Sequence, residues 1–335
     1  MNPVLAELHD KARAVLDPVH YDFFAGGVGD EVVLAENEAA FGRLALLPRV
    51  LRGKEISTDF PLMISPTAFH RLAHPDGELA TARALSGTTL VSSMASTVPI
   101  ADVVAAATGP VWFQLYVQPD MDVTEVLVRR AERAGCAALV VTVDSPVFGR
   151  HRRDIAHGFH DLPAGLTAEN MRDLAGEALR NIEMSTAISW RHVDRIREMT
   201  ALPLWVKGVL HPKDAVIALG HGVAGIVVSN HGGRQLDLVP AALDALPAVV
   251  DAVAGRVPVV LDGGVRGGGD IALALALGAS AAGIGRPVLW GLAADGEQGV
   301  RRVLDVLRDE FLHVLALCGG ELTRDMVVVR GVAGC

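Results

Sequence analysis

Cysteine is scarce in this chain of 335 residues, which contains only three. Cys136, Cys318 and Cys335 are odd in number and widely spaced, whereas disulfide frameworks and cysteine-based zinc sites need paired or closely spaced cysteines. The pattern favours free thiols in a reducing compartment over disulfides or a metal site. We therefore expect no metal centre.

Clusters of positive charge and long apolar segments are also missing. The formal net charge is −9, and the one basic cluster, Arg150–Arg153, is too short for the cationic surface that nucleic-acid binding requires. No segment reaches the roughly 18 uncharged apolar residues of a membrane span. The first ten residues mix charged and apolar side chains and lack a signal-peptide core. We expect a cytoplasmic protein without a membrane span.

What the chain does contain is a series of short apolar runs separated by helical patterns. The runs are Pro61–Ser65, Thr89–Ser93, Val111–Tyr116, Ala138–Asp144, Pro203–Lys207, Gly225–Ser229, Val257–Asp262 and Ala281–Gly285. The helical patterns include Val123–Ala134, Trp190–Met199, Pro212–Leu219 and Asp270–Leu277. Nearly continuous β-branched runs are typical of strands covered on both faces, and their alternation with helices predicts a (β/α)8 TIM barrel. We expect residues 1–335 to form this single domain; a doubly wound open sheet is the alternative.

Polar or charged side chains stand at the C-terminal ends of these predicted strands. They are Ser65, Ser92, Gln114 with Tyr116, Thr142 with Asp144, Lys207, His231, Asp262 and Arg286. Any one of them could be a capping residue or a solvated strand end. Because the active sites of such barrels lie at this face, their convergence predicts an active site there.

The segment Ser229–Asp237 carries the strongest chemical signal. His231 follows a predicted strand, and Gly232, Gly233 and Arg234 come directly after it. The glycines allow a sharp turn and a close approach to a ligand, so a base and a fixed cation share one loop. A core histidine followed by an ordinary turn is the alternative for this piece alone.

The loops after the last two predicted strands indicate a phosphate site. Each loop is glycine-rich, contains an arginine (Arg266 or Arg286) and leads into a helix. Helix N-termini attract anions, arginines add charge-assisted bonds, and barrels commonly bind phosphate at these two loops.

Lys207 ends a strand after apolar residues, which suggests that its side chain contacts a flavin ring or, alternatively, forms a Schiff base. The phosphate loops favour the flavin, because a nearby cation stabilises its reduced, anionic form.

Together these motifs resemble those of the FMN-dependent 2-hydroxy-acid oxidase and dehydrogenase family. The similarity runs from about Tyr21 to Pro287. Besides Ser229–Asp237, it rests on Tyr21–Gly27, Leu34–Asn37, Pro66–Ala68, His74–Glu78, Gln114–Tyr116, Thr142–Asp144, Lys207–Gly208 and Asp262–Arg266. So many motifs in the family's order make the resemblance specific.

The resemblance implies FMN-dependent oxidation of a small L-2-hydroxy acid to the 2-oxo acid, through hydride transfer to flavin N5 or through a carbanion. His231 would be the catalytic base, Asp144 its ionic partner, and Arg234 the cation that holds the substrate carboxylate. Tyr21 and Tyr116 would hydrogen-bond the substrate, Tyr116 as a catalytic group. The implied FMN contacts are Ala68, Ser92, Gln114, Thr142, Lys207 and Ser229 around the ring, Asp262 at the ribityl hydroxyls, and Gly264, Arg266, Gly285 and Arg286 at the phosphate.

The chain departs from the family pattern at His151, where members usually have an arginine that provides a second cation for the substrate. Histidine is shorter and, unlike arginine, is not permanently charged. We expect His151 to line the substrate site. Either Arg150 or Arg152 restores the clamp, or the pocket is altered for a different or bulkier acid or catalyses more weakly. Met94 stands where glycolate oxidase has tryptophan, and methionine there could enlarge the pocket or fill the core.

Two further segments are expected to serve the site. Residues 155–188 form a long connection that resembles the family's active-site lid, with a disordered insert as the alternative. The N-terminal helical segment, within residues 1–42, should pack beside the barrel mouth and deliver Tyr21. The resemblance also implies a homo-oligomer, a tetramer, re-oxidised by oxygen or another external acceptor. An FMN-dependent isomerase, or a flavin-binding relic with a substrate site altered at His151, is the alternative function.

Overall fold

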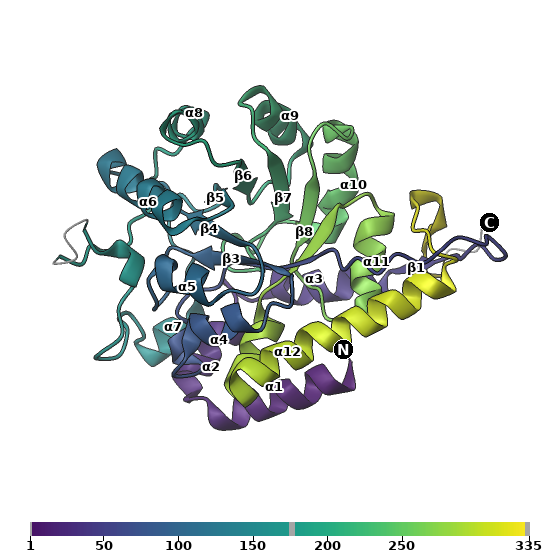
Figure 1. Cartoon of the computed structure of the whole chain (residues 1–335), viewed down its shortest axis with the longest axis horizontal. Helices are drawn as coiled ribbons and strands as arrows, with labels where there is room; N and C mark the ends of the chain where they lie inside the picture. The colour runs from purple at the N-terminus through teal and green to yellow at the C-terminus, as the bar shows by residue number, and fades with distance from the viewer. Residues whose placement is uncertain (1, 174–177, 332–335) are drawn as a thin grey trace.

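Eight parallel strands close into a barrel (Figure 1). The computed structural model describes residues 2–173 and 178–331. The strands are β2 (Leu62–Ile64), β3 (Thr89–Ser93), β4 (Val111–Leu115), β5 (Ala138–Thr142), β6 (Leu204–Lys207), β7 (Gly225–Ser229), β8 (Val259–Asp262) and β9 (Ala281–Ile284). β9 pairs with β2, with Met63 opposite Gly283, and this closure excludes the open sheet. The predicted barrel and its eight strands are confirmed.

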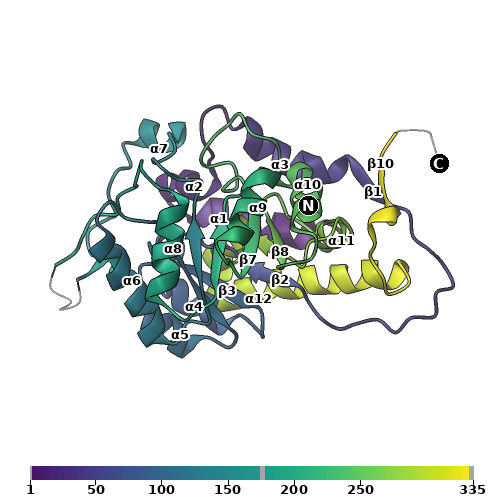
Figure 2. The same ribbon diagram turned by 90° about the horizontal axis from the view of Figure 1, so that it is seen from above.

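Helices follow the strands and cover the outside of the barrel (Figure 2). They are α4 (Gly77–Arg83), α5 (Ile100–Ala106), α6 (Met121–Ala134), α8 (Trp190–Met199), α9 (Pro212–Gly220), α10 (Ala242–Val253), α11 (Gly268–Ala276) and α12 (Arg286–Leu317). The four predicted helices are among them, with slightly shifted ends. α6 shows how local chemistry sets such ends: the Asp120 side chain accepts the Asp122 N–H, and Gly135 takes a left-handed φ of 81° after the last turn.

An apolar layer, to which all eight strands contribute, fills the barrel interior. Its members are Met63, Val91, Trp112, Ala138, Val140, Trp205, Val227, Val260 and Ala281. The rings of Trp112 and Trp205 lie 4.7 Å apart and supply much of the bulk. Because side chains alternate between the two faces of a strand, the residue two positions later on each strand also points inward. This alternation decides which strand-end residues reach the centre of the barrel mouth.

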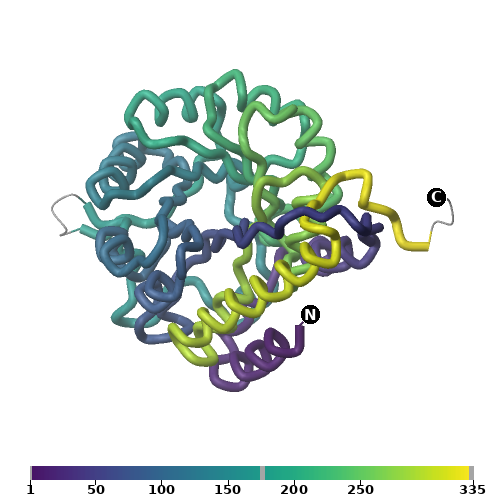
Figure 3. The backbone as a smooth tube through the Cα atoms, turned by 45° about the vertical axis from the view of Figure 1, so that its right-hand side comes forward, coloured from purple at the N-terminus to yellow at the C-terminus, as the bar shows by residue number. Residues whose placement is uncertain are grey.

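Three helices precede the barrel: α1 (Pro3–Val15), α2 (Pro18–Ala25) and α3 (Val32–Gly42). α1 packs along α12, and the two helices run side by side in Figures 1 and 3. α2 contacts α7 (Arg152–His157). The first helix therefore covers the side of the barrel, and the second approaches its mouth.

A small antiparallel sheet outside the barrel is not expected from the sequence. β1 (Leu44–Leu46) pairs with β10 (Val327–Val329), with Leu44 opposite Val329. Figure 2 shows this pair at one edge of the molecule, beyond the barrel. It joins the segment before the barrel to the segment after α12.

The connection between β5 and α8 contains more regular structure than a plain loop. It includes α7 and the 3-10 turn Glu169–Met171; two further 3-10 turns, His70–Leu72 and Arg324–Met326, lie elsewhere. Asn170 is buried, and its side chain accepts the Ile100 N–H at 2.8 Å and donates to Ser96 Oγ at 2.7 Å. These bonds tie the connection to the barrel. Residues 174–177 of the expected lid, 155–188, lie outside the described residues, and its action as a lid stays a prediction.

The thiols are free where the structure describes them. Cys136 and Cys318 are buried and unpaired, while Cys335 lies outside the described residues. Within residues 2–173 and 178–331, no three His, Cys, Asp or Glu side chains gather as metal ligands. No helix in that part of the chain has the length and apolarity to cross a bilayer.

We predict that Gly225→Ala lowers the free energy of unfolding by about 1–3 kcal/mol, the usual cost of overpacking. A Cβ at Gly225 would lie 2.2 Å from the Trp205 ring inside the barrel. Gly220→Ala is the matched control, because a Cβ there meets nothing within 4 Å. Urea denaturation of the two variants and the wild type measures the difference, and equal midpoints for all three would contradict the prediction.

Candidate active site

A layer of polar side chains lies directly above the apolar layer, at the C-terminal ends of the strands. It consists of Ser65, Ser93, Gln114, Thr142, Lys207, Ser229 and Asp262, all buried. Gly283 takes the eighth position, where a Cβ would lie 2.4 Å from Ser65 Oγ. Each member stands two positions after a residue of the apolar layer, so the strand alternation alone brings these polar groups together.

Hydrogen bonds between neighbouring strands connect one half of this layer. Ser93 Oγ donates to Gln114 Oε1 at 3.0 Å, and Gln114 Nε2 donates to Thr142 Oγ1 at 3.1 Å. The strand-end pattern predicts Ser92, but Ser93 occupies the inward position on β3. Ser92 Oγ is buried and has no hydrogen-bond partner among the described residues. Counting inward positions from Val91 could have found Ser93.

The other half of the layer is built on an ion pair. Lys207 Nζ lies 3.0 Å from Asp262 Oδ2, and the two side chains are 5% and 10% exposed. Burial opposes ionisation of Asp262, but Lys207 and hydrogen bonds from Ser65 and Ser229 lower its pKa to about 2. A Schiff base requires a neutral amine, whereas Lys207 faces a fixed carboxylate. The arrangement favours an ion pair at the barrel mouth over the Schiff-base alternative.

Ser229 joins this ion pair to the histidine loop. Its hydroxyl donates to Asp262 Oδ2 at 2.7 Å and accepts the backbone N–H of His231 at 3.0 Å. His231 has a left-handed φ of 61°, and Gly232 and Gly233 continue the turn with φ of 61° and 75°. Non-glycine residues rarely adopt this conformation, and such strain is found where a site holds a side chain in place. The loop therefore presents the imidazole from a fixed backbone.

His231 contacts a carboxylate on one side of its ring and a phenol on the other. Nδ1 lies 2.9 Å from Asp144 Oδ1, and Nε2 lies 3.2 Å from the Tyr116 hydroxyl. Because a carboxylate only accepts, the proton of the neutral ring belongs on Nδ1, which leaves the Nε2 lone pair free to accept. Ser145 Oγ also donates to Asp144 Oδ1. The geometry provides a base whose orientation and tautomer are fixed by its neighbours.

The two groups beside the imidazole are held in opposite protonation states. Burial opposes ionisation of Asp144, but His231 and then Lys207 outweigh it and bring its pKa below the ordinary value. Burial and the Asp144 charge raise the pKa of Tyr116, so that it remains a neutral hydrogen-bond donor. Gly208 has a φ of 105°, and a Cβ there would lie 2.5 Å from the Asp144 carboxyl carbon. Glycine is needed at this position to admit the carboxylate.

Arg234 and Arg286 bind the carbonyl groups at the end of α2. Arg234 Nη1 donates to Phe23 O at 2.8 Å and to Gly26 O at 3.0 Å. Arg286 donates to the carbonyls of Phe24, Ala25, Gly26 and Gly232. Cations at a helix C-terminus satisfy its free carbonyls. Both predicted ligand-binding arginines therefore also attach the N-terminal helices to the barrel mouth.

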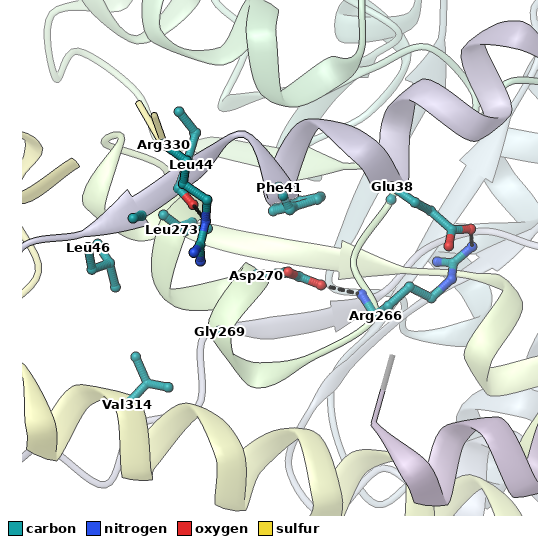
Figure 4. Close-up of a pocket in the computed structure, with 13 residues that line it drawn as sticks. Glu38, Phe41, Leu44, Leu46, Arg266, Gly269, Asp270, Leu273, Val314 and Arg330 are labelled. Carbon is teal, nitrogen blue, oxygen red and sulfur yellow. Dashed lines mark hydrogen bonds and ion pairs between the residues drawn. The ribbon is translucent and has the colours of Figure 1, made fainter. Parts of the chain in front are cut away.

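The guanidinium groups of Arg234, Arg266 and Arg286 lie close enough to influence one another. Burial, Arg234 and Arg266 lower the pKa of Arg286 to about 9, which marks an excess of positive charge. Arg266 Nη2 pairs with Glu38 at 2.8 Å, its Nε is buried without a partner among the described residues, and its guanidinium lies over Trp290. Figure 4 shows Arg266 with Glu38, and its backbone N–H donating to Asp270. Buried excess cations with a free donor fit an anion such as a phosphate.

The groove in Figure 4, of about 470 Å³, is lined partly by Gly264 and Arg266 and partly by β1, α11 and α12. It contains none of the His231 contacts. Gly264 is glycine because α3 passes close by: a Cβ there would lie 2.0 Å from Asn37 O. Gly285 precedes the first residue of α12, at a helix N-terminus suited to anions.

The predicted cofactor residues therefore fit FMN. Ser92, Gln114, Thr142, Lys207 and Ser229 lie on the strands at the barrel mouth, and Ala68 lies in the turn after β2. Asp262 is predicted at the ribityl hydroxyls, but in the structure both its oxygens are bound by Ser65, Ser229 and Lys207. The predicted phosphate residues Gly264, Arg266, Gly285 and Arg286 lie after the last two strands, with the excess positive charge described above.

The prediction that Tyr21 contacts the substrate is wrong in this structure. The Tyr21 hydroxyl lies 2.8 Å from His9 Nε2 of α1, and Arg13 lies over its ring. Residues two apart on a helix point to nearly opposite sides, so Phe23 faces the mouth instead, with its ring centre 5.2 Å from Arg234 Cζ. The sequence motifs did not identify Phe23 as a residue of the site, although its position two residues after Tyr21 on the helix could have indicated that it faces the opposite side.

His151 lies behind Arg234 rather than beside its guanidinium. Its Nε2 lies 2.9 Å from the Arg234 carbonyl oxygen and its Nδ1 lies 3.2 Å from Asp154 Oδ2. Arg152 pairs with Asp30 at the surface, so it does not restore the expected clamp. The imidazole fixes the Arg234 backbone, which is a different role from the expected contact with the substrate.

Met94 is fully buried, and its sulfur accepts the Tyr116 N–H at 3.1 Å. Because it has no exposed surface, it supports Tyr116 from behind and does not line the substrate site. The core-packing alternative is the one that the structure favours.

Comparison with known proteins agrees with this geometry. Residues 12–327 match the model of a family described as FMN-dependent dehydrogenase. The chain belongs to this family. It is 45% identical to glycolate oxidase 3 of Arabidopsis thaliana, over 94% of this chain and 92% of that protein. It is 43% identical to 2-hydroxyacid oxidase 2 of Mus musculus, over 96% and 97%.

A solved structure of mandelate oxidase with 3,3-difluoro-2-hydroxy-3-phenylpropionic acid superposes with a TM-score of 0.87 and 42% identity, covering 94% of both chains. As a member of the FMN-dependent dehydrogenase family, the protein is an oxidoreductase with FMN as its cofactor. Its FMN-binding barrel is therefore established independently of the individual contacts.

We predict that Asp262→Asn destabilises the protein by about 3 kcal/mol near pH 7, because it leaves the Lys207 ammonium buried without its counter-ion. Ser65→Ala, the control, removes one neutral donor to the same carboxylate and should cost about 1 kcal/mol. The folded-state pKa of about 2 means that the contribution of the pair is complete above the unfolded pKa and is lost as the pH falls through 2. Urea unfolding at several pH values measures both effects. An Asp262→Asn protein as stable as the wild type would contradict the prediction.

Proposed function

We propose that this protein oxidises an L-2-hydroxy acid to the corresponding 2-oxo acid, with FMN as its redox cofactor and His231 as its base. The observation that carries the proposal is the His231 ring, hydrogen-bonded to Asp144 through Nδ1 and with Nε2 3.2 Å from the Tyr116 hydroxyl. Relatives named glycolate oxidase and 2-hydroxyacid oxidase support the substrate class.

The substrate loses a hydroxyl proton and the hydrogen on C2. His231 Nε2 accepts the proton, and the imidazolium that forms is stabilised by Asp144 at 2.9 Å; each pKa unit of such stabilisation is worth about 1.4 kcal/mol. FMN, when bound, supplies the acceptor for the hydride equivalent from C2. The C2–O bond thereby becomes the carbonyl of the 2-oxo acid.

Arg234 and Tyr116 orient the substrate in this proposal. The Arg234 guanidinium pairs with the carboxylate, and its bonds to Phe23 O and Gly26 O limit its movement. Tyr116 is a neutral phenol that donates to the substrate oxygen or to its carboxylate. Holding both partners in one geometry lowers the entropic cost of reaching the transition state.

The Lys207 ammonium supports the same direction of reaction. Asp262 and Ser229 fix the position of this buried cation, which would favour negative charge on the FMN ring if the cofactor is bound beside it. The alternative of a flavin-binding protein that no longer binds a substrate is disfavoured, because the Arg234 guanidinium remains anchored and His151 supports the Arg234 backbone. The isomerase alternative is disfavoured by the His231–Asp144 pair and by the names of the relatives.

The remaining proposals rest on resemblance and composition. Oxygen or another external acceptor re-oxidises the enzyme, and four copies assemble into a tetramer. Free thiols favour a cytoplasmic location, although one relative from Arabidopsis thaliana is named a peroxisomal (S)-2-hydroxyacid oxidase.

We predict that anaerobic mixing of the holoenzyme with an L-2-hydroxy acid bleaches the flavin absorbance, and that Asp144→Asn slows this reduction at least about 100-fold. The variant should keep its FMN, because the fold and phosphate loops are unchanged. Ser145→Ala, which removes only one donor to Asp144, serves as the control and should lose less than about 10-fold. Reduction of Asp144→Asn at the wild-type rate would contradict the role of this pair, and failure of every hydroxy acid to bleach the wild type would contradict the proposed function.

We predict that His151→Leu raises the KM for the hydroxy acid about 10-fold, whereas His151→Gln stays within about 3-fold of the wild type. Glutamine keeps an N–H that can donate to the Arg234 carbonyl, and leucine cannot. Losing this one hydrogen bond should weaken substrate binding by about 1.4 kcal/mol, which corresponds to the factor of ten in KM. Steady-state kinetics with FMN content as a control measures it. Equal KM values for the two variants would exclude a role through this bond.

A further inference from the structure

Three phenylalanines from distant parts of the chain meet at the barrel mouth, and one of them, Phe23, lies under the Arg234 guanidinium. Phe23 lies on α2, Phe69 follows β2, and Phe159 follows α7. The ring centre of Phe23 is 6.0 Å from that of Phe69 and 5.3 Å from that of Phe159. We call these three residues the phenylalanine wall. Each is partly exposed in the structure, so the wall offers accessible apolar surface at the barrel mouth.

The phenylalanine wall has no polar atom of its own. The chain contains only two tyrosines; one hydroxyl is bound to His9 on α1 and the other lies beside His231. The Phe23 and Phe159 rings meet edge to face, with an interplanar angle of 63°, an arrangement that aromatic pairs favour. The three rings themselves can therefore contact an apolar group but provide no hydrogen bond to a polar one.

The position of the phenylalanine wall follows from the groups around it. Arg234 Cζ lies 5.2 Å from the centre of the Phe23 ring, so a carboxylate paired with this guanidinium brings the rest of its molecule close to the wall. The hydroxyl side is occupied by His231 and Tyr116. Of the substituents on C2, only the side chain is left to meet the apolar surface.

Two observations connect the phenylalanine wall to the catalytic loop. Phe159 follows the helix whose first turn carries Asp154, and that carboxylate contacts His151, which in turn binds the Arg234 backbone. Phe23 provides a carbonyl to Arg234 as well as a ring. The same short elements therefore hold the carboxylate-binding cation and the apolar surface in one arrangement.

We propose that the phenylalanine wall receives the side chain of the substrate and makes the enzyme selective for 2-hydroxy acids with an aromatic side chain. This inference rests on the proposed function and narrows it. Burial of an aryl group against the rings is favourable in proportion to the apolar area removed from water. Glycolate has no side chain and gains nothing from this surface.

The test compares (S)-2-hydroxy-3-phenylpropanoate with glycolate as anaerobic reductants of the holoenzyme. The wild type should show a kcat/KM for the phenyl substrate at least about 10-fold above that for glycolate, and Phe159→Ala should lower this ratio about 10-fold, mainly through KM. Phe69→Ala provides a second, independent change in the phenylalanine wall and should act in the same direction. Phe60→Ala is the control, because Phe60 packs on Phe311 and Arg308 away from Arg234, and it should leave the ratio unchanged.

The outcomes separate the two proposals. Reduction by glycolate at least as efficient as by the phenyl substrate, or a ratio that neither variant changes, overturns the role of the phenylalanine wall and leaves the proposed oxidation intact. Absence of reduction by every hydroxy acid tested overturns the proposed function itself. Flavin absorbance and circular dichroism verify that each variant keeps FMN and the fold.

Discussion

The buried contact between Lys207 and Asp262 is the interaction on which the barrel mouth depends. It joins β6 to β8 across Ser229 of β7, and that serine also receives the backbone N–H of His231. Removing two charges from water is costly, and a buried pair of this kind often adds little net stability. The pair instead fixes positions, because only one arrangement of the Lys207 ammonium, the Ser229 hydroxyl and the histidine loop satisfies all of their hydrogen bonds. The catalytic backbone is thus held by an electrostatic constraint on the strands below it.

A second constraint acts from above the barrel. Arg234 comes from the loop after β7 and Arg286 begins α12 directly after β9, and both bind carbonyls at the end of α2. The N-terminal helices are consequently part of the site, because their attachment fixes the Arg234 guanidinium at the barrel mouth. The same attachment brings Phe23 to the mouth. A change in the packing of α2 would therefore move both the Arg234 guanidinium and the Phe23 ring.

The pattern of strands was predictable because each strand of the barrel is covered on both faces and reads as an apolar run. β1 and β10 have three residues each and form strands only by pairing with each other, although they lie near opposite ends of the chain. No local sequence pattern predicts them. The sequence pattern also did not show which of two serines at the end of β3 points into the barrel. Ser92 and Ser93 are chemically alike, and only the register set by Val91 places Ser93 in the polar layer.

The sequence by itself determined the barrel, because its strands read as apolar runs between helical patterns. Its ordered motifs resemble the FMN family, and that resemblance also implied the pairing of His231 with Asp144. Tertiary structure decided which residues face the barrel mouth. Tyr21 points to His9 while Phe23 points to Arg234, since helix packing selects one of two opposite faces. His151 binds a backbone carbonyl 83 positions away in the chain, and Met94 is buried behind Tyr116. Such contacts join distant segments whose approach no local pattern of residues encodes.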